Sequence, residues 1–212
     1  PPGVGKTYVI LTMAACIAAG DSRFWIVEQR PVVFVNLERS RASVMYRMRR
    51  LSDALGINPA GLAFVHGRDV AFPQMLPKLR EIQRRATQTV FIVDSLSRIG
   101  IGSLNKDDVA REDMAMLNSL GSTWVAIGHT PRADNDHIVG SMMFDAAADL
   151  TVGVKSEQTP GRLAVALQVT KANDVAFPPK EYLRFSFDMD GVTSVSRGES
   201  NDVPNLELGS RL

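Results

Sequence analysis

The seven residues PPGVGKT (residues 1–7) open the chain, and the apolar, alanine-rich stretch 8–19 follows them directly. Gly-Lys-Thr before a helix is the end of the phosphate-loop pattern G-x-x-x-x-G-K-[ST], whose first glycine would fall one position before Pro1. In this pattern the backbone N–H groups and the lysine bind phosphates, and the hydroxyl ligates Mg²⁺. The stretch therefore predicts a loop that binds the phosphates of a nucleotide at the positive end of a helix.

The nucleotide contacts expected from this loop fall on its own residues and on the residue that follows it. Lys6 is expected to reach the β- and γ-phosphates, and Thr7 to ligate Mg²⁺. The alternative is a turn rich in glycine and proline before an ordinary core helix, in which Gly-Lys-Thr stands by chance. The expected nucleotide-binding residues are Gly3, Val4, Gly5, Lys6, Thr7 and Tyr8.

The composition is that of an ordinary globular domain, with 212 residues, 45% of them hydrophobic and 22% charged. We expect one domain over residues 1–196 and a polar tail or linker over residues 197–212. A net charge of +1 neither requires nor excludes a polyanionic partner. The single cysteine, Cys16, allows no disulfide within the chain, which fits a reducing cytoplasm. The apolar stretch 8–19 is too short to span a bilayer, so no membrane association is expected.

Short runs of β-branched and aromatic residues alternate with helical patterns, which predicts an α/β fold with a mainly parallel sheet flanked by helices. Two later runs, 163–170 and 182–188, are expected to be antiparallel strands that extend this sheet at the C-terminal end. The expected parallel strands are 32–37, 63–65, 90–94, 123–128 and 150–154, and the expected helices between them are 41–55, 74–86 and 107–120.

The strand that feeds a phosphate loop normally lies centrally in the sheet of such a fold. The sequence has no residues before Pro1 that could form it. The first strand is therefore expected to be missing, and the chain to be a fragment of a longer protein.

Two carboxylates are expected at the carboxyl edge of the sheet. Asp94 ends the buried run 90–94 and is expected to hold Mg²⁺, directly or through water; an aspartate that caps the next turn is the alternative. Glu38 follows the run 32–37 and could orient or deprotonate the attacking water; a solvated glutamate at the start of a helix is the alternative.

A histidine follows the next apolar run at the same edge. His129 could contact the γ-phosphate and transmit its loss to the loop that follows. A histidine that merely finds a partner within a loop is the alternative, and the sequence leaves both open.

In this order the motifs resemble the RecA-like ATPases, and most closely the hexameric replicative helicases of the plasmid RepA and DnaB kind, a branch of the AAA-type ATPase domains. The resemblance covers about residues 1–188, and His129 stands where many relatives carry glutamine. It rests on PPGVGKT, on Glu38 at a strand end, on VDS at 93–95, on GHT at 128–130 and on VGSMMFD at 139–145.

The resemblance implies that two loops face a central channel and contact the backbone of single-stranded DNA. These loops are 97–108 and 131–139. Ordinary solvated loop charges are the alternative, and the nearby aspartates dilute the positive field. The candidate contacts with nucleic acid are Arg98, Lys106, Arg132, Asn135 and His137.

The resemblance also implies that a basic residue on a late strand reaches the γ-phosphate held by the neighbouring subunit. Lys171 matches that location, and a plain lysine at a strand end is the alternative. We therefore expect a RecA-like ATPase that hydrolyses ATP with Mg²⁺ in a homo-oligomeric ring, a hexamer, and couples hydrolysis to DNA unwinding or translocation as a replicative helicase. A recombinase or repair ATPase on single-stranded DNA and a KaiC-like regulatory ATPase without nucleic acid are the alternatives.

Overall fold

The structure of the chain is a computed structural model that describes residues 5–100, 106–129 and 143–204. Two short 3₁₀ turns, η1 (Leu96–Arg98) and η2 (Ser200–Asp202), complete the regular elements. In chain order the helices and strands are α1 (Lys6–Ala19), β1 (Val32–Asn36), α2 (Arg41–Leu55), β2 (Leu62–His66), α3 (Phe72–Arg85), β3 (Val90–Asp94), α4 (Asp107–Asn118), β4 (Trp124–Ala126), α5 (Met143–Ala147), β5 (Leu150–Thr159), β6 (Arg162–Ala172), β7 (Glu181–Asp188) and β8 (Gly191–Arg197).

Strands β1 to β4 form a parallel sheet in the order β2-β1-β3-β4. Every residue of β1 and β3 is buried, as expected for central parallel strands that are covered on both faces. Side chains alternate along β1, so Val33 and Val35 share a core with α3 and α4, whereas Val32 and Phe34 share a core with α1 and α2. The expected α/β fold with a parallel sheet flanked by helices is confirmed.

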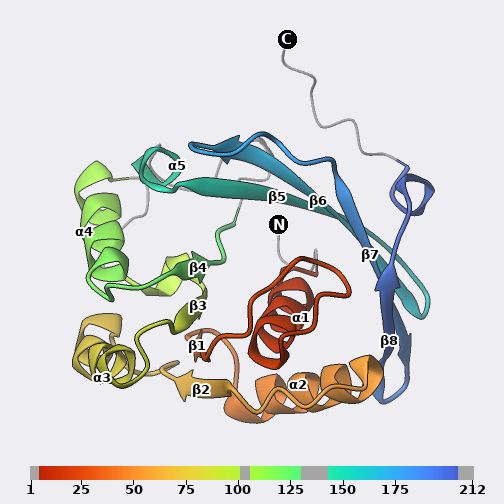
Figure 1. The fold of residues 1–212 in the computed structure, drawn as a ribbon, viewed down its shortest axis with the longest axis horizontal. Coiled ribbons are helices and arrows are strands. Elements are labelled where there is room, and N and C mark those ends of the chain that lie inside the picture. Colours follow the sequence, from red (N-terminus) through yellow and green to blue (C-terminus); the bar gives the residue numbers. More distant parts are fainter. Residues whose placement is uncertain (1–4, 101–105, 130–142, 205–212) are drawn as a thin grey trace.

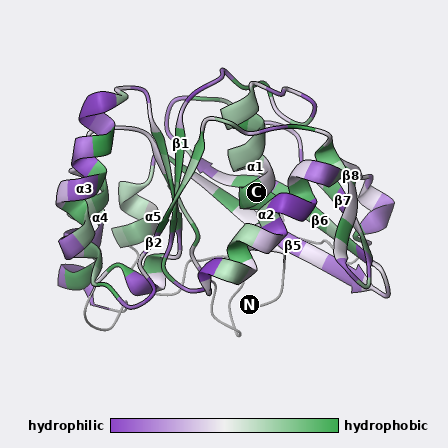
Figure 2. Ribbon diagram, turned by 90° about the horizontal axis from the view of Figure 1, so that it is seen from below, coloured by the Kyte–Doolittle hydropathy of each residue, from purple (hydrophilic) through white to green (hydrophobic). Residues whose placement is uncertain are grey.

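Helix α1 lies between the parallel sheet and a second sheet that arches over it (Figure 1). Most of its residues are buried, as is typical of a helix that is apolar on all sides. The side chain of Thr12 is buried in this helix, and its hydroxyl group donates a hydrogen bond of 2.8 Å to the carbonyl oxygen of Tyr8. Figure 2 shows the contrast with α3 and α4, which carry hydrophilic residues as well as hydrophobic ones because one side of each faces solvent.

The second sheet is antiparallel, in the order β5-β6-β7-β8. The antiparallel strands are therefore present, but the expectation that they extend the parallel sheet is wrong, since they form a sheet of their own. The assignment of 150–154 to the parallel part is also wrong, because β5 pairs antiparallel with β6 from Leu150↔Ala172 to Thr159↔Arg162. A run of alternating apolar residues predicts a strand but does not say which strand will be its partner.

Gly5, in the turn before α1, lies against this antiparallel sheet. Gly5 has φ +79°, a left-handed conformation that favours glycine. A Cβ atom at Gly5 would lie 2.8 Å from Cδ2 of Leu163 and 3.2 Å from Cγ2 of Val165. Both the backbone conformation and the close approach of β6 therefore require glycine at this position.

Part of the segment expected to be a polar tail packs on the antiparallel sheet. Asp202 in η2 accepts hydrogen bonds from Arg162 and from Arg184, the latter at 2.7 and 2.8 Å. Val203 is 5% exposed and joins Ala164 in a small apolar cluster. The residues up to 204 are thus held against the outer face of the sheet, and residues 205–212 lie outside the described part.

Candidate nucleotide-binding site

The register of the parallel sheet brings three sequence-predicted residues to one edge. Asn36 pairs with Asp94, and Val93 pairs with Ala126, so β1, β3 and β4 end side by side. Glu38 lies two residues beyond the end of β1, and His129 lies three beyond the end of β4. The carboxyl edge of a parallel sheet is where open α/β folds bind ligands.

Lys6, His129 and Glu38 form a continuous chain of contacts. Nζ of Lys6 lies 3.3 Å from Nδ1 of His129. On the other side of the imidazole, Nε2 lies 3.5 Å from Oε1 of Glu38. The lysine of the phosphate loop therefore faces the carboxylate beyond β1 with only the imidazole between them.

Thr7 and Asp94 form the second contact between the loop and the sheet. The Thr7 hydroxyl donates to Oδ2 of Asp94 at 3.3 Å, and the aspartate is 2% exposed. Burial raises the pKa of Asp94, and the negative charge of Glu38 raises it further, while Arg39 and the Thr7 hydroxyl oppose the rise. This carboxylate would gain from a nearby cation, because its charge is only weakly compensated.

Glu38 has the opposite electrostatic character. The pKa of Glu38 falls to about 2, first because of its hydrogen bond with His129 and then because of hydroxyl donors at Ser95 and Ser97. The Ser95 hydroxyl binds Oε1 of Glu38 closely, and the Ser97 hydroxyl lies 3.3 Å from the same oxygen. Glu38 is thus ionised at neutral pH and held in place by donors.

Lys6 carries its charge in a partly desolvated place. Burial lowers the pKa of Lys6, and the charges of Glu38 and Asp94 oppose that fall. A cation that is short of solvent and beside two carboxylates is suited to an anionic ligand that completes its shell.

A cavity of about 400 Å³ joins these groups. Lys6, Thr7, Tyr8, Glu38, Asp94 and His129, all singled out from the sequence, line it together. The antiparallel sheet contributes a wall that the sequence patterns do not indicate. The lining residues that we did not assign to the site from the sequence are Arg39, Arg47, Ile127, Gln158, Leu163 and Phe187.

Tyr8 fixes one side of this cavity. Its ring lies 5.8 Å from that of Phe185 and 5.2 Å, edge to face, from that of Phe187. The guanidinium of Arg47 lies over the ring, 5.1 Å from its centroid. The aromatic contacts join α1 to β7, and the cation–π contact joins α1 to α2.

The remaining sequence-predicted residues lie away from this cavity or outside the described part of the chain. Nζ of Lys171 donates to the carbonyl oxygens of Ala146 and Ala148, at 3.0 and 2.6 Å, and Lys171 is not among the residues that line the cavity. Arg98 ends η1 and Lys106 precedes α4, and both are exposed. Gly3, Val4, Arg132, Asn135 and His137 lie outside the described residues, as does most of the segment 139–145.

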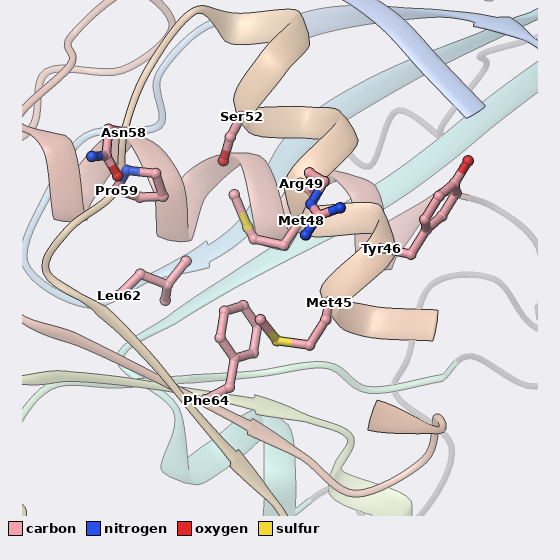
Figure 3. A pocket seen from close by; sticks show the side chains of 9 residues that line it. All are labelled: Met45, Tyr46, Met48, Arg49, Ser52, Asn58, Pro59, Leu62 and Phe64. Carbon is pink, nitrogen blue, oxygen red and sulfur yellow. The ribbon is translucent and has the colours of Figure 1, made fainter. Parts of the chain in front are cut away.

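A second cavity, of about 440 Å³, lies between α2 and β2. Met45 and Met48 of α2 face Leu62 and Phe64 of β2 across it (Figure 3). Arg49 is the only charged residue among those that line it. It shares no residue with the phosphate loop, so it is not part of the candidate site.

The donors present fit a magnesium ion that is shared with phosphates. Among the described residues no group of three or more His, Cys, Asp or Glu side chains could hold a metal by itself. Mg²⁺ usually takes one or two carboxylates and completes its shell with water and substrate phosphates. The Thr7 hydroxyl and the buried carboxylate of Asp94 supply oxygen ligands of that kind beside the phosphate loop.

The fold is that of a P-loop domain of the RecA-like kind. A family model described as an AAA domain matches residues 1–135, more than half of the chain, so the chain belongs to that family. The comparison with curated proteins found no match. Within the described residues, no helix is long and apolar enough to cross a membrane.

Among solved structures the chain is similar to a protein described as a DnaB-like replicative helicase, whose structure was studied with its interactions with primase. The TM-score is 0.61 and the sequence identity is 12% over 93% of this chain. At that identity the likeness shows the fold, which is that of the RecA-like ATPases. The match covers 57% of the helicase chain, so the chain described here corresponds to little more than half of it.

Proposed function

We propose that the chain is the ATPase domain of a DNA motor and hydrolyses ATP with Mg²⁺. The observation that carries the proposal is the convergence of Lys6, Thr7, Glu38, Asp94 and His129 on one cavity. These residues come from four separate segments of the chain, and each has the chemistry that phosphoryl transfer requires. The AAA domain family and the likeness in fold to a DnaB-like helicase support it.

Each residue has a distinct role in this proposal. Lys6 binds the β- and γ-phosphates, while Thr7 and Asp94 hold Mg²⁺, which neutralises negative charge on the phosphate oxygens when it is bound. Glu38 accepts a proton from water as the water oxygen attacks the γ-phosphorus. The bond from that phosphorus to the bridging oxygen breaks, and ADP leaves with the electron pair.

His129 is proposed to respond to the γ-phosphate. Its imidazole contacts both Lys6 and Glu38, so a phosphate bound by Lys6 would alter its contacts. The residues after His129 belong to a loop predicted to contact DNA. We propose that His129 couples the nucleotide state to that loop.

The DNA part of the proposal concerns Arg98 and Lys106, which stand at the two ends of the segment after β3. Exposed cations of this kind bind the phosphate backbone and do not read the base sequence. We propose a ring of identical subunits, a hexamer, as the working assembly, because such a ring would place these loops around one strand. Lys171 is proposed to act on the neighbouring subunit's nucleotide.

The test is ATP turnover with and without single-stranded DNA. DNA should raise turnover, and the stimulation should fall as salt rises, because DNA binding releases counterions. Replacing both Arg98 and Lys106 by alanine should weaken stimulation and leave DNA-free turnover unchanged. If DNA does not change ATP turnover, the proposal of a DNA motor is contradicted and a regulatory ATPase is favoured. Filaments of variable length instead of closed rings would favour a recombinase.

A further inference from the structure

Two arginines in the wall of the nucleotide cavity have no role in the proposed mechanism. Arg39 directly follows Glu38, and Arg47 lies on α2. Both line the same cavity as Lys6, Thr7 and Asp94. Together with Lys6 they place three cationic side chains around one space.

Neither guanidinium forms a salt bridge in the described part of the chain, although the charge of Asp94 acts favourably on both. Nε of Arg39 is buried without a hydrogen-bond partner. The Arg47 guanidinium lies over the face of the Tyr8 ring. Nε of Arg50 and of Arg184 is likewise buried without a partner, but a terminal nitrogen of each is paired with a carboxylate, Arg50 with Asp188 and Arg184 with Asp202.

The two cations also disfavour each other. Burial lowers the pKa of Arg47, and the positive charge of Arg39 lowers it further, while Tyr8 and the charge of Asp94 oppose the fall. Like charges in a partly desolvated place are costly unless an anion compensates them. Asp94 offsets part of this cost, and a ligand with further negative charge in the cavity would offset more of it.

The backbone that carries Arg39 is fixed by a buried side chain. Nδ2 of Asn36 donates to the carbonyl oxygen of Arg39 at 2.7 Å, and the Arg39 N–H donates to Oδ1 of Asn36 at 3.0 Å. Asn36 is fully buried, and its Nδ2 also lies 3.2 Å from Nδ1 of His66. The backbone of Arg39 is thus held by hydrogen bonds, and the Arg47 guanidinium packs on the Tyr8 ring. Both side chains are therefore preorganised for a ligand.

The position of the pair within the cavity indicates which part of a nucleotide it meets. Arg39 is next in sequence to Glu38, the proposed base. The positive charge of Arg39 lowers the pKa of Asp94, the proposed magnesium ligand. Those two carboxylates mark the end of the cavity where the terminal phosphate would lie. A triphosphate carries an additional charged group at this end, and a diphosphate does not.

We propose that Arg39 and Arg47 form the subsite for the terminal phosphate of a nucleoside triphosphate, supplied by the same chain that holds the phosphate loop. The inference rests on the proposed function, and it adds a cation source that needs no neighbouring subunit. The planar guanidinium can donate two hydrogen bonds to phosphate oxygens and can stabilise the charge that develops during transfer. The pair would make the cavity prefer triphosphate over diphosphate.

The test compares two nucleotides by calorimetry in the presence of Mg²⁺: ADP and an ATP analogue with an imido bridge between the β- and γ-phosphorus. Arg39→Met and Arg47→Met remove the charge and keep an unbranched apolar stem. Each should weaken analogue binding about 10- to 100-fold, the range for a hydrogen bond to a charged group, and change ADP binding by less than about threefold. Arg49→Met is the matched control on α2, because Arg49 lines the other cavity, and it should change neither.

The outcomes separate this inference from the function on which it rests. If the unaltered chain binds neither nucleotide, or if Lys6→Ala binds both as well as before, the proposed function fails. If the unaltered chain binds both and the two methionine variants keep the ratio of the two affinities, only the terminal-phosphate subsite fails. An equal loss of affinity for ADP and for the analogue would place the arginines beside a group that the two nucleotides share. That result would also overturn the terminal-phosphate subsite. Unchanged ADP binding by the variants would show that they are folded.

A mixing experiment tests whether the arginines act within their own chain. Arg39→Met and Glu38→Gln protomers should not restore turnover when combined in one assembly, since every site then carries one of the two changes. Recovered turnover would show that Arg39 serves a neighbouring subunit and would overturn the assignment.

Discussion

Nζ of Lys6 lies 3.3 Å from Nδ1 of His129. Because an ammonium group can only donate, Nδ1 must accept, and the proton of the neutral imidazole lies on Nε2, which faces Glu38. The histidine therefore connects the cation of the phosphate loop with the proposed base in one tautomer.

Lys6→Ala should abolish nucleotide binding. The lysine supplies charge to two phosphates, and a contact of this kind is worth about 1.5–3 kcal/mol for each hydrogen bond lost. Calorimetric titration with ATP and Mg²⁺ measures the loss. Lys78→Ala, an exposed change on α3, is the control and should bind normally. Nucleotide binding by Lys6→Ala at full affinity would contradict the assignment of the phosphate loop.

Glu38→Gln should keep ATP binding and slow hydrolysis by about 100-fold or more, as the loss of a general base does. Glutamine retains the shape and accepts from Ser95 but cannot take the proton. Single-turnover measurements separate binding from chemistry here. Normal hydrolysis would mean that another group positions the water.

Asp94→Asn should act on the metal instead. Its main effect should be a higher Mg²⁺ concentration for half-maximal nucleotide binding, because asparagine lacks the charge that holds the ion. A titration of Mg²⁺ at fixed ATP measures the shift. An unchanged Mg²⁺ requirement together with slow turnover would assign Asp94 to a different step.

The pH dependence of stability should reveal Asp113, a fully buried carboxyl of α4 whose oxygens have no hydrogen-bond partner in the described part. Burial, and then the charge of Glu112, raises the pKa of Asp113 to about 6. A raised pKa means that its contribution to stability is fully present below the unfolded value near 3.8 and is lost as the pH rises through about 6.

Replacing Asp113 with asparagine should therefore stabilise the fold more at high pH than at low pH. The stabilisation of Asp113→Asn relative to the unaltered chain, measured as the difference in unfolding free energy, should grow between pH 5 and pH 8 by about 1–1.5 kcal/mol. Urea unfolding at the two pH values measures it. Asp53→Asn, an exposed change on α2, is the control. An equal difference at both pH values would show that Asp113 does not titrate in this range.

Lys171→Ala protomers should bind nucleotide almost normally and turn over slowly, if Lys171 acts across a subunit boundary. The lost cation would then contribute mainly to the transition state. Combining these protomers with Glu38→Gln protomers in one ring should restore part of the turnover, because some interfaces then pair an intact Glu38 with an intact Lys171. Rings in which mixing is verified but turnover does not recover would leave Lys171 with its contacts to Ala146 and Ala148 as a structural residue.

Local sequence was sufficient for several of the elements, although it did not indicate α5 or β8. The helix Arg41–Leu55 and the strand Val90–Asp94 begin and end where the sequence predicts. Ser40 caps that helix by accepting from the N–H of Ser43, and Gly56 ends it in a left-handed conformation. These signals are local, since they depend on periodicity and on residues next to the element, and for that reason they can be read without knowledge of packing.

The partners of each element, in contrast, were decided by the tertiary structure. Alternation in β5 to β7 predicts strands, but only the folded chain separates them into a second sheet and brings Leu163 against Gly5. The same holds for Arg39 and Arg47, which the helical pattern treats as ordinary polar positions. They enter the cavity because α2 packs on α1 and because Asn36 fixes the turn before α2. Sequence alone therefore determined which residues are candidates for phosphate chemistry, whereas long-range packing decided which further side chains surround them, because contacts between distant segments leave no periodic signal in the chain.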